Sequence, residues 1–165
     1  MKALTGILSL VFLGVTAYGF AADNRPASSN GIAYPEGWQQ WAVIGVSHRT
    51  DNNTLRVIVG NTIAVTAARS GKTNPWPEGS ILGKVVWKDT QLRDWKEATA
   101  PGKFVHAEFM FKDSAKYIQS HGWGWARWVG LDKKPFAKGM NGCISCHMPV
   151  EKQDLVFTRP AVFPR

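Results

Sequence analysis

The chain has 165 residues, of which 44% are hydrophobic and 19% are charged, and its formal net charge is +8 at pH 7. This length and composition are typical of one globular domain, and they exclude a wholly disordered chain, collagen and a multi-pass membrane protein. The excess of Lys and Arg favours acidic partners, but no basic run is longer than two residues, so nucleic acid is not an expected partner.

The first 22 residues have the pattern of a secretory signal peptide. Lys2 gives a positive start, residues 7–15 form an apolar run, and small residues precede a cleavage site that we expect after Ala21 or Ala22. The apolar run is shorter than the ~20 residues needed to span a bilayer, which favours cleavage over a membrane anchor. We therefore predict a protein that is exported to the periplasm with residues 1–22 removed.

The mature chain is predicted to begin with a flexible leader and to continue as one domain. Residues 23–33 are polar with Pro, Ser and Gly, whereas an ordered domain is expected over 34–165. A short helical turn is predicted over 38–41. The β-branched segment 54–59 is predicted to pair as a hairpin with the apolar strand 42–47.

The middle of the chain alternates between predicted strands and short helices. A helix over 62–70 is expected to end at Gly71. It is followed, in chain order, by a strand over 80–88, a strand over 102–112, a short helix over 114–120 with Asp113 as its N-cap, and a strand over 122–131. Antiparallel strands with a few short helices place the fold in the α+β class.

Residues 143–147 read Cys-Ile-Ser-Cys-His, the C-x-x-C-H sequence that attaches haem covalently. On a helical turn, Cys143 and Cys146 project from the same side, so both thiols can add to the vinyl groups of one haem. The next residue, His147, can then face the iron. We predict one covalent haem c with His147 as its proximal ligand.

Two other functions are possible for the cysteines, a redox or disulfide pair and half of a zinc site. A redox pair of the thioredoxin type normally opens a helix near the start of a fold, whereas Cys143 and Cys146 lie near the end of this chain. Zinc would need a further ligand from His48, His106 or His121.

The sixth position of the iron decides between an electron carrier and an open site. Met148 follows the proximal histidine too closely to reach the opposite haem face, and Met140 lies just before the motif. Met110 is more typical of packing, and the three remaining histidines are more typical of surface or supporting positions: His48, His106 and His121. We favour an open sixth position, with Met110 or a histidine as the alternative ligand.

Taken together, these segments resemble the cytochrome P-460 family, which includes the cytochromes c′-beta. The resemblance rests on YPEGW, TLRVIVGN, WPEGSILGKVVWK, AEFMFKD, CISCH and VFTRP, and it covers essentially the whole mature region. It implies a five-stranded antiparallel sheet with peripheral helices, a homodimer, one haem c per subunit and a five-coordinate iron with His147 proximal.

The resemblance also suggests roles for residues outside the motif. Lys84 matches a lysine that the P-460 branch cross-links to the haem ring, although a solvated lysine or a propionate partner fits equally. Arg56 falls where the family places a distal arginine, which could bind an iron-bound ligand or a propionate. Glu108 shares a strand face with His106 and Met110, so it is the expected distal proton acceptor, and burial is expected to keep its pKa suited to base chemistry.

The leading hypothesis is a periplasmic cytochrome that binds small nitrogen species and, if Lys84 is cross-linked, oxidises hydroxylamine. One alternative is a binder of nitric oxide or carbon monoxide without catalysis, in which Phe104, Phe109 or Phe111 crowds the distal side. The other is a six-coordinate electron carrier. A redox partner protein is expected, and Arg159 is a candidate partner for a haem propionate.

Overall fold

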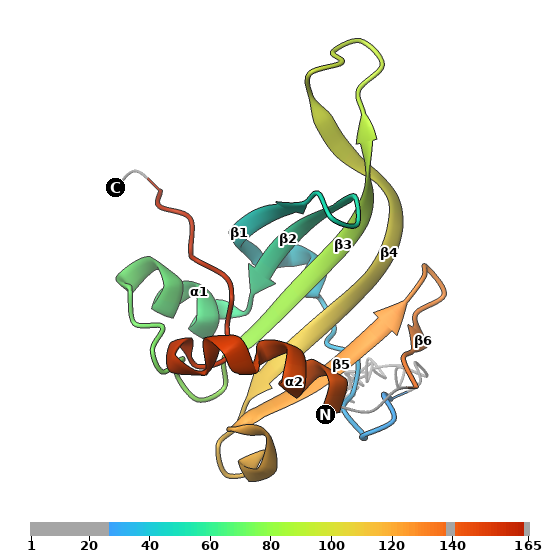
Figure 1. Cartoon of the computed structure of the whole chain (residues 1–165). Helices are drawn as coiled ribbons and strands as arrows, with labels where there is room; N and C mark the ends of the chain where they lie inside the picture. Colours follow the sequence, from blue (N-terminus) through green and yellow to red (C-terminus); the bar gives the residue numbers. More distant parts are fainter. Residues whose placement is uncertain (1–26, 138–140, 164–165) are drawn as a thin grey trace, which may run out of the picture.

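The computed structural model describes residues 27–137 and 141–163, which form a six-stranded antiparallel sheet in the order β1-β2-β3-β4-β5-β6 (Figure 1). The expected signal peptide lies outside the described residues. The strands are β1 (Ala42–Arg49), β2 (Thr54–Gly60), β3 (Ile81–Gln91), β4 (Thr99–Lys112), β5 (Trp123–Val129) and β6 (Lys134–Pro135). The helices are α1 (Thr62–Ser70) and α2 (Asn141–His147), with 3₁₀ turns η1 (Trp38–Gln40), η2 (Ile118–Ser120) and η3 (Met148–Gln153).

The α+β class is confirmed, but the prediction of five strands is wrong. The sixth strand, β6, has only two residues, and it pairs with Trp128 and Val129 of β5. Two residues carry no alternation of polar and apolar side chains, so the pattern of the sequence could not indicate this strand.

Local signals placed α1 correctly. The side chain of Asn61 accepts a hydrogen bond from the Ala64 amide at 3.0 Å, and Gly71 ends the helix in the left-handed conformation with φ of 71°. All the described helices are short, and none is long and apolar enough to cross a membrane.

Two predicted elements differ in extent from those of the structure. The β3–β4 hairpin is longer than predicted, pairs as far as Gln91 with Thr99, and projects beyond the rest of the sheet (Figure 1). The predicted N-cap at Asp113 is present, since its Oδ1 accepts from the Lys116 amide at 2.9 Å, but the predicted helix over 114–120 is only one turn followed by η2, which ends at the left-handed His121.

Both faces of the sheet are covered. On one face, Ile32 and Tyr34 are buried against the sheet, and the rings of Tyr34 and Trp128 meet edge to face at 5.0 Å. Part of the expected leader therefore packs on the sheet, and Asn30 donates to the Trp125 carbonyl at 2.8 Å. On the other face lie α1 and the segment formed by α2 and η3, with Leu155 and other apolar residues buried beneath them.

Candidate functional site

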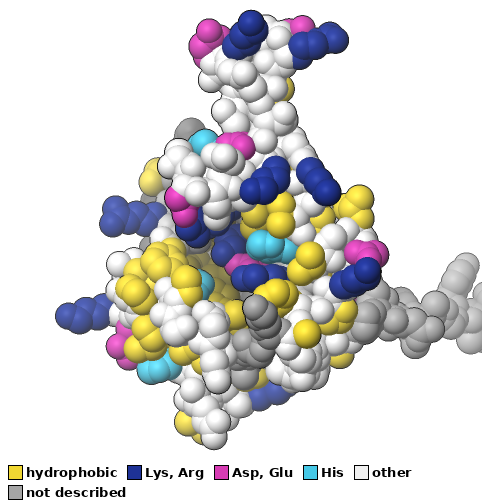
Figure 2. Space-filling model, turned by 45° about the vertical axis from the view of Figure 1, so that its right-hand side comes forward, with side chains coloured by type: hydrophobic (Ala, Val, Ile, Leu, Met, Phe, Trp, Pro, Cys, Tyr) yellow, Lys and Arg dark blue, Asp and Glu magenta, His cyan; other side chains and the backbone are white. Residues whose placement is uncertain are grey.

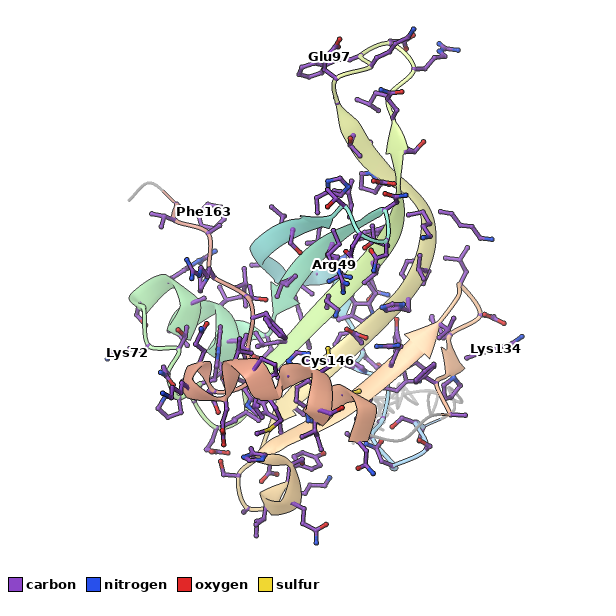
Figure 3. The ribbon with its side chains drawn as sticks, in the orientation of Figure 1. Arg49, Lys72, Glu97, Lys134, Cys146 and Phe163 are labelled. Atoms are coloured by element: carbon purple, nitrogen blue, oxygen red, sulfur yellow. The ribbon has the colours of Figure 1, made fainter. Side chains whose placement is uncertain are left out.

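A large cavity opens between the sheet and the chain that runs from α2 to the C-terminal tail. Its volume is about 1190 Å³. Figure 2 shows this hollow, in which Lys or Arg, acidic and His side chains gather beside hydrophobic ones. Two of the lining residues are labelled in Figure 3, Arg49 at the end of β1 and Cys146 on α2. The site therefore has one wall from the sheet and one from the C-terminal segment.

The predicted motif lies on α2, and Cys143, Cys146 and His147 all line the cavity. Cys143 is half-buried and Cys146 is exposed, and both thiols are free rather than joined as a disulfide. Burial raises the pKa of the Cys143 thiol. The helical turn that the spacing required is present, so both thiols face the same space.

His147 is held in one orientation by the chain that follows it. Its Nδ1 donates to the Leu155 carbonyl oxygen at 2.6 Å, because a carbonyl oxygen can only accept. The rings of Trp125 and Phe157 flank it, with centroids 4.5 and 5.1 Å away. Burial lowers the pKa of His147, although the bond to Leu155 acts in the opposite direction. A neutral imidazole whose Nδ1 is bonded in this way has Nε2 available to ligate a metal.

Three charged side chains form a row across the sheet, here named the charged row: Lys84 on β3, Glu108 on β4 and Arg127 on β5. Lys84 and Arg127 are the two register partners of Glu108. Glu108 forms an ion pair with Lys84, and its Oε2 accepts from Nε and Nη2 of Arg127, each at 2.5 Å. Arg127 was not predicted from the sequence. The available signal was its spacing of two residues from Trp125, which puts both side chains on one face of β5.

The charged row fixes the ionisation of Glu108. Burial raises the pKa of this carboxyl group, but the charges of Lys84 and Arg127 outweigh burial and lower the pKa from 4.5 to about 2. The expectation that burial would keep this pKa suited to base chemistry is therefore wrong, because it did not include the two cations. Glu108 is a carboxylate throughout the neutral pH range.

Arg56 and His106 line the same cavity beside the charged row. Arg56 is half-buried, its Nε has no hydrogen-bond partner among the described residues, and burial together with the charge of Arg49 lowers its pKa. His106 Nε2 lies 3.5 Å from Oε2 of Glu108. Burial lowers the pKa of His106 to about 4, so this side chain is neutral at neutral pH.

The residues of the cavity fit a haem. The thiols and the imidazole of the motif lie on one wall of the cavity. The buried Nε of Arg56 has no hydrogen-bond partner among the described residues, and an anionic group in the cavity could accept its hydrogen bond. Cations exceed carboxylates among the lining residues, which suits the two propionates of a haem: Arg49, Arg56, Lys84, Arg127 and Arg159 against Glu108.

The zinc alternative finds no support in the side-chain arrangement. Within residues 27–137 and 141–163, no group of three or more His, Cys, Asp and Glu side chains is arranged to hold a metal ion. His48 and His121 instead pair with surface carboxylates, Asp89 at 2.7 Å and Glu151 at 3.5 Å.

Two of the predicted candidates for a sixth iron ligand reach the cavity, Met110 and His106. Met110 is 9% exposed and belongs to the apolar cluster that includes Trp125. Met140, the candidate just before the motif, lies outside the described residues.

The phenylalanines expected to crowd the ligand mostly face away from the cavity. Phe109 is 1% exposed in the cluster on the opposite sheet face, although it also contributes to the cavity wall. Phe104 and Phe111 are not among the described lining residues. Strand alternation puts Phe111 on the same face as Phe109, and the register shift between the pairs Val86–His106 and Trp87–Phe104 brings Phe104 to that face too. Phe136 and Phe157, which were not predicted from the sequence, line the cavity instead.

Comparison with known proteins agrees with this site. A family model described as Cytochrome P460 matches residues 35–158. That span contains every strand of the described sheet, the motif on α2 and all the described residues that line the cavity except Arg159. A search of curated proteins found no match.

Proposed function

The chain belongs to the cytochrome P460 family and is therefore a cytochrome with a haem cofactor, and from this premise we propose a periplasmic protein with one covalent haem c. Cys143 and Cys146 would hold the haem, and His147 would be its proximal ligand. The observation that carries the proposal is that these three side chains line one cavity while His147 Nδ1 is bonded to a carbonyl, which leaves Nε2 for iron.

We further propose that the iron has an open sixth position that binds a small nitrogen compound, hydroxylamine or nitric oxide. A haem bound there would supply an iron that can accept a nitrogen lone pair and pass the electrons of the oxidation to a redox partner protein. Arg56 would donate a hydrogen bond from its unpartnered Nε to a ligand or to a propionate.

Oxidation of hydroxylamine also requires a group that takes protons. Glu108 is ionised, but with a pKa of about 2 it holds a proton only briefly. His106, which is neutral and lies 3.5 Å from Glu108, would take that proton on toward solvent. The two side chains would therefore act as a relay at the sheet wall of the cavity.

Two narrower functions remain as alternatives to catalysis. Lys84 lines the cavity, which supports the cross-link, but its ion pair with Glu108 supports equally a protein that binds nitric oxide or carbon monoxide without reaction. Met110 and His106 line the cavity too, which supports a six-coordinate electron carrier. In each case the basic chain would dock an acidic redox partner, and a homodimer is proposed from the family resemblance.

The absorption spectrum of the purified ferrous protein, before and after carbon monoxide, tests these functions. We expect a high-spin spectrum that changes with carbon monoxide, and a strongly red-shifted main band if Lys84 is cross-linked. A low-spin spectrum that carbon monoxide does not change would refute the open site and favour the electron carrier.

Variants separate attachment from cross-linking. Replacing both Cys143 and Cys146 with Ser should leave no haem on the chain after denaturation. Lys84→Ala should remove any red-shifted band. Lys88→Ala is the matched control, since Lys88 is on the same strand, bonds to the Asn52 carbonyl and is not among the described residues that line the cavity.

A further inference from the structure

The chain makes a tight turn directly after η3, here named the Asp154 turn. Asp154 and Leu155 both have left-handed backbone, with φ of 52° and 61°, which is unfavourable for residues with a side chain. The Asp154 amide donates to the Glu151 carbonyl at 3.0 Å, and the Leu155 amide donates to the Val150 carbonyl at 3.1 Å. Two such residues in succession persist only where the surrounding structure holds them.

The carboxylate of Asp154 ties this turn to the body of the protein. Its Oδ1 accepts from Lys112 Nζ at 2.7 Å and from Trp123 Nε1 at 3.2 Å, and its Oδ2 accepts from the Trp76 amide at 2.8 Å. The side chains of Lys112 and Asp154 are 6% and 11% exposed. The three donors come from the end of β4, the start of β5 and the loop before β3. The turn is thereby fixed to one end of the sheet, where β3 and β5 begin and β4 ends.

A buried ion pair is a poor way to gain stability alone. Removing two charges from water costs about as much as their attraction returns, so apolar replacements of similar size often fold as well. The pair of Lys112 and Asp154 is therefore better explained by what it positions.

What the Asp154 turn positions is the carbonyl group of Leu155. Leu155 is 1% exposed, and its oxygen accepts the hydrogen bond from His147 Nδ1 at 2.6 Å. The carbonyl belongs to the residue that directly follows the anchored Asp154. A hydrogen bond to Nδ1 orients an imidazole ligand and makes its other nitrogen a stronger donor to a metal.

We propose that Lys112 and Asp154 are positioning residues for the proximal histidine, because they hold the Leu155 carbonyl where it accepts from His147. The inference rests on the proposed function in one respect, that His147 ligates the haem iron. A stronger imidazole donor favours ferric over ferrous iron, so loosening the turn raises the reduction potential.

Asp154→Asn tests the proposal in the haem-loaded protein, since it keeps the side-chain shape and removes the charge. The readouts are the ferrous iron–histidine stretching frequency by resonance Raman and the reduction potential by redox titration. We expect a lower iron–histidine frequency and a higher reduction potential. At the midpoint potential of the wild type, the ferrous-to-ferric ratio should rise roughly tenfold, which for one electron corresponds to a shift of about 59 mV. If the single variant does not fold, the neutral double variant Lys112→Met/Asp154→Asn gives the same test.

Val85→Ala is the control for general loss of stability. Val85 is 2% exposed, pairs with Ala107, and is not among the described residues that line the cavity. Val85→Ala should lower the melting temperature without changing the iron–histidine frequency or the reduction potential. If the Asp154 variants also lower only the melting temperature, the ion pair of Lys112 and Asp154 is structural and the proposal is wrong. A wild-type protein without an iron–histidine vibration would refute ligation by His147 itself.

Discussion

Replacing Glu108 with Gln measures how strongly the charged row depends on its carboxylate. The Glu108 pKa is lowered from 4.5 to about 2, and each pKa unit corresponds to about 1.36 kcal/mol of stability. The side chain is 17% exposed, so water screens it little. The ionised carboxylate therefore adds about 3 kcal/mol to the free energy of unfolding at neutral pH. Gln keeps the shape but leaves Lys84 and Arg127 without their shared counter-ion.

The sign of the pH dependence follows from the direction of the shift. Because the folded pKa lies below the unfolded one, the contribution of Glu108 is present above 4.5 and is lost as the pH falls through the folded value of about 2. The wild type should exceed Glu108→Gln in unfolding free energy by about 3 kcal/mol at about pH 7, and by about 1 kcal/mol at about pH 3.

Urea unfolding of the haem-loaded proteins, followed by far-ultraviolet circular dichroism across this pH range, provides the measurement. Glu97→Gln is the matched control, since Glu97 is exposed at the tip of the β3–β4 hairpin, far from the charged row (Figure 3). Its difference from the wild type should stay close to zero at every pH. A difference for Glu108→Gln that stays constant between the two pH values would refute the electrostatic explanation and indicate that the side chain stabilises by packing.

Two further substitutions test the scaffold. Asn61→Ala removes the N-cap of α1, whose Oδ1 accepts from the Ala64 amide at 3.0 Å and from the Ile81 amide at 3.1 Å. It should lower the free energy of unfolding in urea by about 1–2 kcal/mol. An unchanged urea midpoint would contradict the assignment of this cap. Gly83→Ala would place a Cβ atom 2.7 Å from the ring of Phe109, which is 1% exposed. It should lower the free energy of unfolding by about 1–3 kcal/mol and therefore the melting temperature. A melting temperature equal to that of the wild type would show that the ring moves aside.

Local patterns explain most of what the sequence predicted of the fold. The predicted bounds of α1, residues 62–70 with Gly71 after them, are confirmed because helix caps depend only on neighbouring residues. The length of the β3–β4 hairpin was not predicted, because residues such as Asp89 and Pro101 have low strand preference and become strand only by pairing with each other. The helix over 114–120 was predicted too long, because a cap such as Asp113 shows where a helix begins but not how far it continues.

The site residues also differ in whether local sequence could predict them. The motif on α2 is contiguous, so its spacing alone predicted three cavity residues: Cys143, Cys146 and His147. Lys84 and Glu108 were selected separately, but their ion pair and the part played by Arg127 depend on strand register, which a single sequence does not determine. The expected pKa of Glu108 was wrong for this reason.

This division predicts that the two walls of the cavity can be changed independently. The α2 wall holds the attachment groups and depends on the Asp154 turn, whereas the sheet wall supplies Arg56, His106 and the charged row. Substitutions on α2 should therefore decide whether haem is bound and how His147 donates to it. Substitutions of Arg56, His106 or the charged row should leave haem attached and change what the iron binds and where protons go. Cytochromes that share the motif on α2 but differ along the sheet wall would then differ in chemistry rather than in haem attachment.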